Sequence, residues 1–78
     1  MEKLIEITNK AVADYGFRQI VQWSPEDIAA QWQLSTREVE LLTGIIKDEL
    51  DRLPIPVEPS EVPQEQERVA DIIRQALS

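Results

Sequence analysis

Residues 35–53 give the strongest helix signal in this chain of 78 residues. The stretch opens with Ser35 and Glu38 in a Ser-x-x-Glu pattern, whose side chains bind the first free amides of a helix. Apolar residues then share one stripe at helical spacing: Val39, Leu42, Ile46, Leu50 and Leu53. Leu41 and Ile45 fall on a second face, roughly 130–160° away. A helix with two apolar faces lies between neighbours or buries one face in a partner.

Shorter helical patterns precede this stretch. Residues 3–15 are amphipathic, and Gly16 is their expected stop because glycine tolerates positive φ. Phe17, Ile20 and Val21 predict a second short helix that reaches about Trp23.

A third helix is predicted to start at Ser24 and to end near Gln33. Ser24 is the expected N-cap, and Pro25 suits the first helical position because no amide is needed there. Ile28, Ala29 and Trp32 face one way, which predicts Trp32 in the core, and Leu34 is expected to enter the core at the following turn.

Residues 54–63 contain four prolines, which predict an extended, polyproline-like strap. Ile55 and Val57 are the side chains that would fix this strap to the domain. A last amphipathic helix is predicted over residues 63–77, with its apolar residues on one face: Val69, Ile72, Ile73, Ala76 and Leu77. It is too short to be stable alone in water and must therefore dock.

The predicted fold is all-α. Residues 1–53 form a compact domain of three to four helices, residues 54–63 form a proline-rich extended linker, and residues 64–78 form a C-terminal amphipathic helix. This helix docks either on its own domain or on a second chain.

The composition argues against an enzyme. The chain has no cysteine and no histidine, which removes disulfides, the usual zinc ligands and the usual general base. The acidic residues Asp48 and Asp51 lie beside Lys47 and Arg52, which is typical of a solvated, ion-paired helix face. We therefore predict no catalytic residues, no cofactor and no metal site.

The net charge is −7, and the acidic excess lies in residues 24–78. Such a surface repels phosphates and anionic lipids, which disfavours nucleic acid as a partner. No apolar run is long enough to span a bilayer, and the N-terminus lacks a signal-peptide core. A cytoplasmic protein without membrane contact is expected.

Residues 27–42 resemble the helix-turn-helix of bacterial regulators. Ala29 stands where a small residue lets the two helices approach, and residues 35–36 would open the recognition helix. The resemblance implies DNA contacts by Thr36, Arg37 and Lys47. Two features depart from the pattern: Gln33 stands where the turn usually carries glycine, and the reading face holds Glu38 and Glu40.

A longer stretch, residues 10–42, carries a second resemblance through Lys10-Ala11, Asp14, Phe17-Arg18, Pro25-Glu26, Ala29 and Leu34-Ser35. This pattern resembles the leader regions of ribosomally made peptide natural-product precursors of the nitrile-hydratase-like and related types. It also resembles the small helical alpha subunit of protocatechuate-type extradiol dioxygenases. Both resemblances imply a helical handle that a larger protein grasps.

The function predicted from the sequence is a small acidic protein–protein interaction module, acting as an adaptor, accessory subunit or recognition handle. Its partner would be a larger protein or a second copy of the chain in a homodimer. The predicted partner-binding residues are the exposed or surplus apolar side chains Trp23, Leu41, Ile45, Val69, Ile72, Ile73 and Ala76. The alternative is a dimeric helix-turn-helix regulator that binds DNA.

Overall fold

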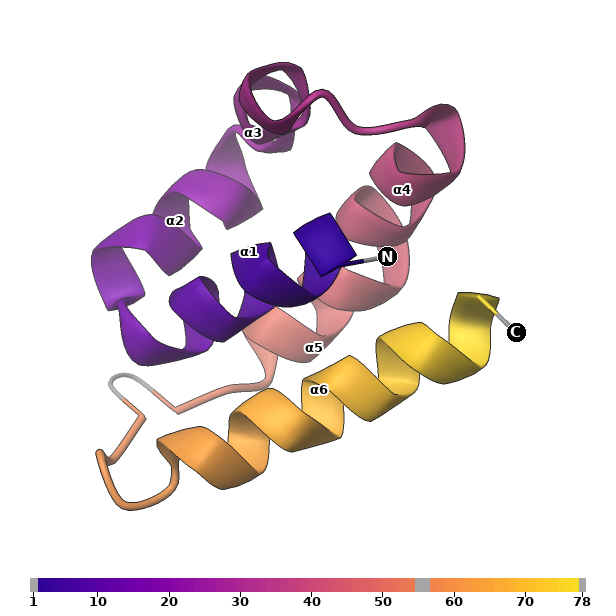
Figure 1. The fold of residues 1–78 in the computed structure, drawn as a ribbon. Coiled ribbons are helices and arrows are strands. Elements are labelled where there is room, and N and C mark those ends of the chain that lie inside the picture. Colours follow the sequence, from indigo (N-terminus) through magenta and orange to yellow (C-terminus); the bar gives the residue numbers. More distant parts are fainter. Residues whose placement is uncertain (1, 55–56, 78) are drawn as a thin grey trace.

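The structure, a computed structural model, describes residues 2–54 and 57–77. No strand occurs in these residues, and the predicted all-α fold is confirmed. The helical elements are α1 Glu2–Ala13, α2 Tyr15–Trp23, α3 Pro25–Trp32, α4 Thr36–Leu41, the π-helix η1 Leu42–Ile46, α5 Lys47–Asp51 and α6 Val62–Leu77. Elements α4, η1 and α5 follow one another without a break and form a single long rod (Figure 1).

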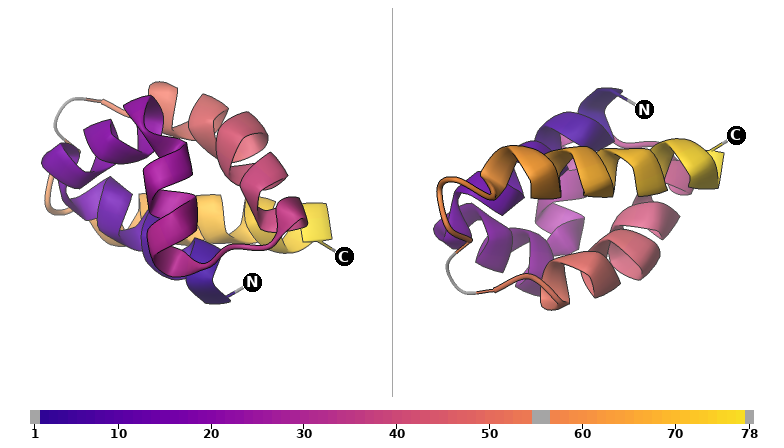
Figure 2. Two further views of the ribbon diagram at one scale, coloured as in Figure 1. Left: turned by 90° about the horizontal axis from the view of Figure 1, so that it is seen from above. Right: turned by 90° about the horizontal axis from the view of Figure 1, so that it is seen from below.

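Helix α1 is central to the packing, because it lies against both α2 and α6. The rod formed by α4, η1 and α5 packs on α2, and α3 crosses the far end of the bundle (Figures 1 and 2). The buried apolar side chains form one core cluster to which every helix except α4 contributes. Trp32 and Leu34 are partly buried and pack against this cluster, as the sequence predicts.

The break between the first two helices lies at Asp14, and the prediction of a stop at Gly16 is wrong. Asp14 adopts an extended conformation, and its Oδ1 accepts a hydrogen bond from the Phe17 amide at 3.2 Å. This N-cap starts α2 at Tyr15, so Gly16 lies inside the second helix. Tyr15 therefore belongs to α2 rather than to the face of the first helix.

Helix α3 begins at Pro25 as predicted, but the Ser24 side chain makes no capping hydrogen bond. The helix ends at Trp32, and the C-cap residue Gln33 has a left-handed φ of 54°. The backbone of Gln33, a non-glycine residue, thus adopts the turn conformation that glycine favours. The next helix starts with the predicted capping box, because the Ser35 hydroxyl accepts from the Glu38 amide and the Glu38 carboxylate accepts from the Ser35 amide.

The long predicted helix contains a wider π turn at residues 42–46. A π turn takes more residues than the 3.6 of an α-turn, and Leu42, Ile46 and Leu50 all reach the core across it. Leu41, from the predicted second face, is half-buried and packs against the core. Ile45 is 36% exposed.

Helix α6 lies along α1 in the same chain (Figure 1). Val69, Ala70 and Ile73 are buried there, and Gln66 Nε2 donates to the Asn9 carbonyl at 2.9 Å. In the strap before α6, Val57 is buried as expected, whereas Ile55 lies outside the described residues.

Candidate functional site

Trp23, the last residue of α2, is 81% exposed. Val21 and Arg18 are buried on the inner side of α2, which turns the opposite side of the helix outward. Ile20, one turn before Trp23, is also exposed, at 49%. Residues three apart on a helix are surface neighbours, and these two side chains form what we name the Trp23 patch.

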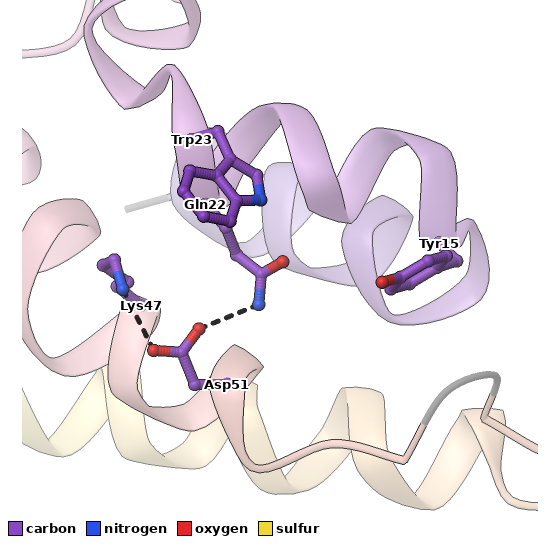
Figure 3. A pocket seen from close by; sticks show the side chains of 5 residues that line it. All are labelled: Tyr15, Gln22, Trp23, Lys47 and Asp51. Carbon is purple, nitrogen blue, oxygen red and sulfur yellow. Dashed lines mark hydrogen bonds and ion pairs between the residues drawn. The ribbon is translucent and has the colours of Figure 1, made fainter.

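A hollow of about 320 Å³ lies beside this patch, between α2 and α5 (Figure 3). We name it the α2–α5 hollow; its lining residues are Tyr15, Gln22, Trp23, Lys47 and Asp51. Two hydrogen bonds order its polar side: Asp51 Oδ1 accepts from Gln22 Nε2 at 2.9 Å, and Asp51 Oδ2 pairs with Lys47 Nζ at 3.0 Å. Trp23 and Tyr15 supply its aromatic surface from opposite ends of α2 (Figure 3).

Arg18 lies beneath this region and is only 1% exposed. Its guanidinium donates to the carbonyls of Leu53 and Pro54, at 3.4 and 3.1 Å, and lies over the ring of Tyr15. Burial lowers the pKa of Arg18, because removal from water disfavours the charged form. Its Nε has no hydrogen-bond partner within residues 2–54 and 57–77. Arg18 therefore ties α2 to the chain where it leaves α5.

The charges near the Trp23 patch are unbalanced. Each lysine and arginine is buried or engaged: Lys47 pairs with Asp51 and Arg52 with Glu49, for example. Glu26 and Asp27, in the first turn of α3 and three and four residues after Trp23, are exposed and have no ion pair or hydrogen bond from a described side chain. The rim of the patch next to α3 is therefore negatively charged.

The structure separates the sequence-predicted partner-binding residues into two groups. Trp23 and Ile45 are exposed, but Ile45 does not line the hollow. Val69 and Ile73 are fully buried within this chain, and they form no exposed surface in this conformation. Leu41, Ile72 and Ala76 are half-buried.

The residues that the helix-turn-helix resemblance implies do not form one basic face. Thr36 is exposed at the start of α4, and Arg37 donates to the Ala76 carbonyl of α6 at 3.0 Å. Lys47 lies on α5 and pairs with Asp51 beside the hollow. The exposed surface of α4 also carries Glu40.

Sequence reasoning missed four residues of this region: Ile20, Tyr15, Gln22 and Asp51. Helical periodicity could have predicted that Ile20 is exposed. Arg18 and Val21 are three residues apart, so they share one face of α2, and if that face is the buried one, Ile20 points outward. No local signal pointed to Gln22 and Asp51, because their hydrogen bond joins residues 29 positions apart.

Within residues 2–54 and 57–77, no three acidic, histidine or cysteine side chains lie close enough together to hold a metal ion. In the same part of the chain, no helix has both the length and the apolar character needed to cross a bilayer.

No protein-family model matches this chain, and no curated protein and no solved structure is significantly similar to it. The resemblances described for residues 10–42 and 27–42 therefore stay predictions, and the function is argued from the geometry of the site.

Proposed function

We propose that this chain is a small acidic protein–protein interaction module without catalytic activity, and that it binds through the Trp23 patch and the α2–α5 hollow. The observation that carries the proposal is the 81% exposure of Trp23 beside a hollow of about 320 Å³. Tryptophan is among the residues most enriched at binding hot spots, where it fills a pocket on the partner or packs next to one.

The exposed apolar surface is large enough to matter energetically. Burying one tryptophan removes about 150–250 Å² from water, which corresponds to about 4–6 kcal/mol before the costs of association are subtracted. Ile20 adds a second apolar side chain one turn away. Leu42 and Ile46, by contrast, are buried, and Ile45 is 36% exposed.

Hydrogen bonds within the chain hold the polar side of the hollow. Asp51 is held by both Gln22 and Lys47, so these side chains already occupy defined positions. Side chains that are ordered in the free protein lose less entropy on binding. This supports a role as an adaptor, an accessory subunit or a recognition handle for a larger protein.

The test is site-specific photo-crosslinking. A benzoylphenylalanine placed at position 23 should give an adduct with one protein in an extract of the cells that make this chain. Excess wild-type chain should compete for the adduct, and a Trp23→Ser chain should not. The matched control carries the same crosslinker at Gln64, an exposed position on α6. Equal adducts from both positions, or competition by Trp23→Ser, would overturn the proposal.

A dimeric helix-turn-helix DNA-binding protein is the second candidate function. It is favoured by the left-handed turn at Gln33 and the capped start of α4, which give α3 and α4 a tight connection. The dispersed and engaged cations count against it, because a groove-binding helix needs lysine and arginine directed at phosphates and bases. If it holds, a salt-sensitive gel shift should be abolished in the Arg37→Ala, Lys47→Ala double variant.

A further inference from the structure

We infer that the Trp23 patch accepts a basic amphipathic helix of a partner protein, in which lysine or arginine residues flank a large apolar side chain. This inference rests on the proposed function and adds the chemistry of the partner. It starts from an exposed tryptophan that is followed, three and four residues later in the sequence, by the exposed carboxylates of Glu26 and Asp27, which pair with no described side chain.

Charge complementarity selects a basic partner. Glu26 and Asp27 follow Trp23 in the chain and are exposed. Lys47, the cation in the hollow, is already paired with Asp51. An incoming cation would thus meet carboxylates at the rim and the indole face of Trp23, which attracts cations through its quadrupole.

The architecture selects a helix as the form of the partner segment. Strand addition needs an exposed sheet edge, and the described residues contain no strand. The hollow instead lies between two helices and is lined by Trp23, and Ile20 is exposed one turn before Trp23 on α2. An amphipathic helix presents apolar side chains at the same spacing, as helices that bind in grooves do.

A second copy of this chain fits the patch poorly. A two-fold symmetric contact would place each patch on its own equivalent and bring Glu26 and Asp27 of both copies together. Each copy also carries a net charge of −7, which opposes self-association at low salt. Self-association is therefore an outcome that would count against the inference.

The test uses a synthetic 15-residue helix of leucine and lysine as the probe, titrated calorimetrically into the full chain at low and at physiological salt. Trp23→Ser and the double variant Glu26→Gln, Asp27→Asn should each weaken binding by about tenfold or more. The matched control, Glu58→Gln with Glu61→Gln, changes the net charge equally but lies at exposed positions in the strap before α6, whereas Trp23 ends α2. It should change binding by less than about twofold. A scrambled peptide of the same composition should also bind about tenfold more weakly.

Three outcomes of calorimetry and sedimentation would overturn the inference. The two double variants could weaken binding equally, which would mean that only net charge matters. Trp23→Ser could bind like the wild type. Sedimentation could show a dimer that Trp23→Ser converts to a monomer. Photo-crosslinking from position 23 is independent of these results: an adduct with an acidic or proline-rich segment would retain the proposed function and reject the basic helix.

Discussion

The contact between α1 and α6 and the contact between α2 and α5 both join two helices, but their chemistry differs. Helices α1 and α6 bring fully buried apolar side chains into the core: Leu4, Ile7, Ala11, Val69 and Ile73. Helices α2 and α5 also bury Val21 and Leu50, yet their outer edge is joined by the Gln22–Asp51 hydrogen bond. The apolar contact leaves little surface for a partner, whereas the polar edge borders the hollow. The main apolar contact and the proposed binding surface therefore lie in different parts of the molecule and should respond to different substitutions.

The largest expected effect comes from weakening the apolar contact. Ile73→Ala should lower the free energy of unfolding by about 2–4 kcal/mol, because it removes fully buried methyl and methylene groups and leaves a cavity. Urea unfolding followed by circular dichroism measures this change. Ile72→Ala is the matched control, since Ile72 is the half-buried neighbour and should cost about half as much. Equal losses at both positions would contradict the assignment of Ile73 to the core contact.

The buried arginine tests the polar side of the comparison. Arg18→Ala should cost about 2–3 kcal/mol, because it leaves the carbonyls of Leu53 and Pro54 without a donor and creates a cavity. Arg18→Met should cost less, because it retains most of the packing and removes a charge that is buried without a carboxylate. Thermal unfolding of both variants provides the measurement. Equal losses for methionine and alanine would show that the hydrogen bonds and the charge of Arg18, rather than the packing of its side chain, stabilise this region.

The capping box gives a smaller, pH-dependent effect on the rod that borders the hollow. The hydrogen bond from the Ser35 amide lowers the pKa of Glu38 below its usual 4.5. Because the folded-state pKa is the lower one, this stabilisation is fully present above pH 4.5 and is lost as the pH falls through the folded-state value.

The variant for this test is Glu38→Gln, which keeps an acceptor for the Ser35 amide but removes the charge. At pH 7 it should be less stable than the wild type by about 0.5–1 kcal/mol. The difference should shrink toward pH 3 in urea titrations. A difference that does not change with pH would contradict this account.

The smallest expected change in stability follows removal of the exposed tryptophan. Trp23→Ser should alter the free energy of unfolding by less than about 0.5 kcal/mol, because the side chain is 81% exposed. The same substitution at Trp32, which packs against the core, should cost about 2–4 kcal/mol. Chemical denaturation of both variants decides the matter. A large loss at Trp23 would mean that it holds the fold rather than a partner.

Local patterns were sufficient to predict much of the fold. The capping box at Ser35 and Glu38, the start of α3 at Pro25 and the burial of Leu42, Ile46 and Leu50 depend on spacing along one segment. The helix after the strap begins at Val62, one residue before the predicted position. Such features follow from backbone chemistry and from helical periodicity.

The remaining features depend on residues far apart in the sequence, or on positions where two neighbouring residues both suit a helix boundary. Asp14 and Gly16 both suit a helix boundary, and the Asp14 cap decided the position of the break. Arg18 is buried because carbonyls 35 and 36 positions later accept its hydrogen bonds. The hollow has the same origin, since its two sides come from α2 and α5. Sequence periodicity predicts which residues share one face of a helix, but not which other segment of the chain packs against that face.

The π turn at residues 42–46 sets the rotational phase between the two ends of the rod. A π turn is equivalent to one residue inserted into an α-helix, and each α-helical residue advances the helix by about 100°. Deleting Gly44 would remove the inserted residue and give an uninterrupted α-helix. It would also rotate α4 relative to α5, and Arg37 would turn away from the Ala76 carbonyl that it now contacts. The π turn thus rotates α4 relative to α5. The number of residues in this turn determines which side chains of α4 face α6.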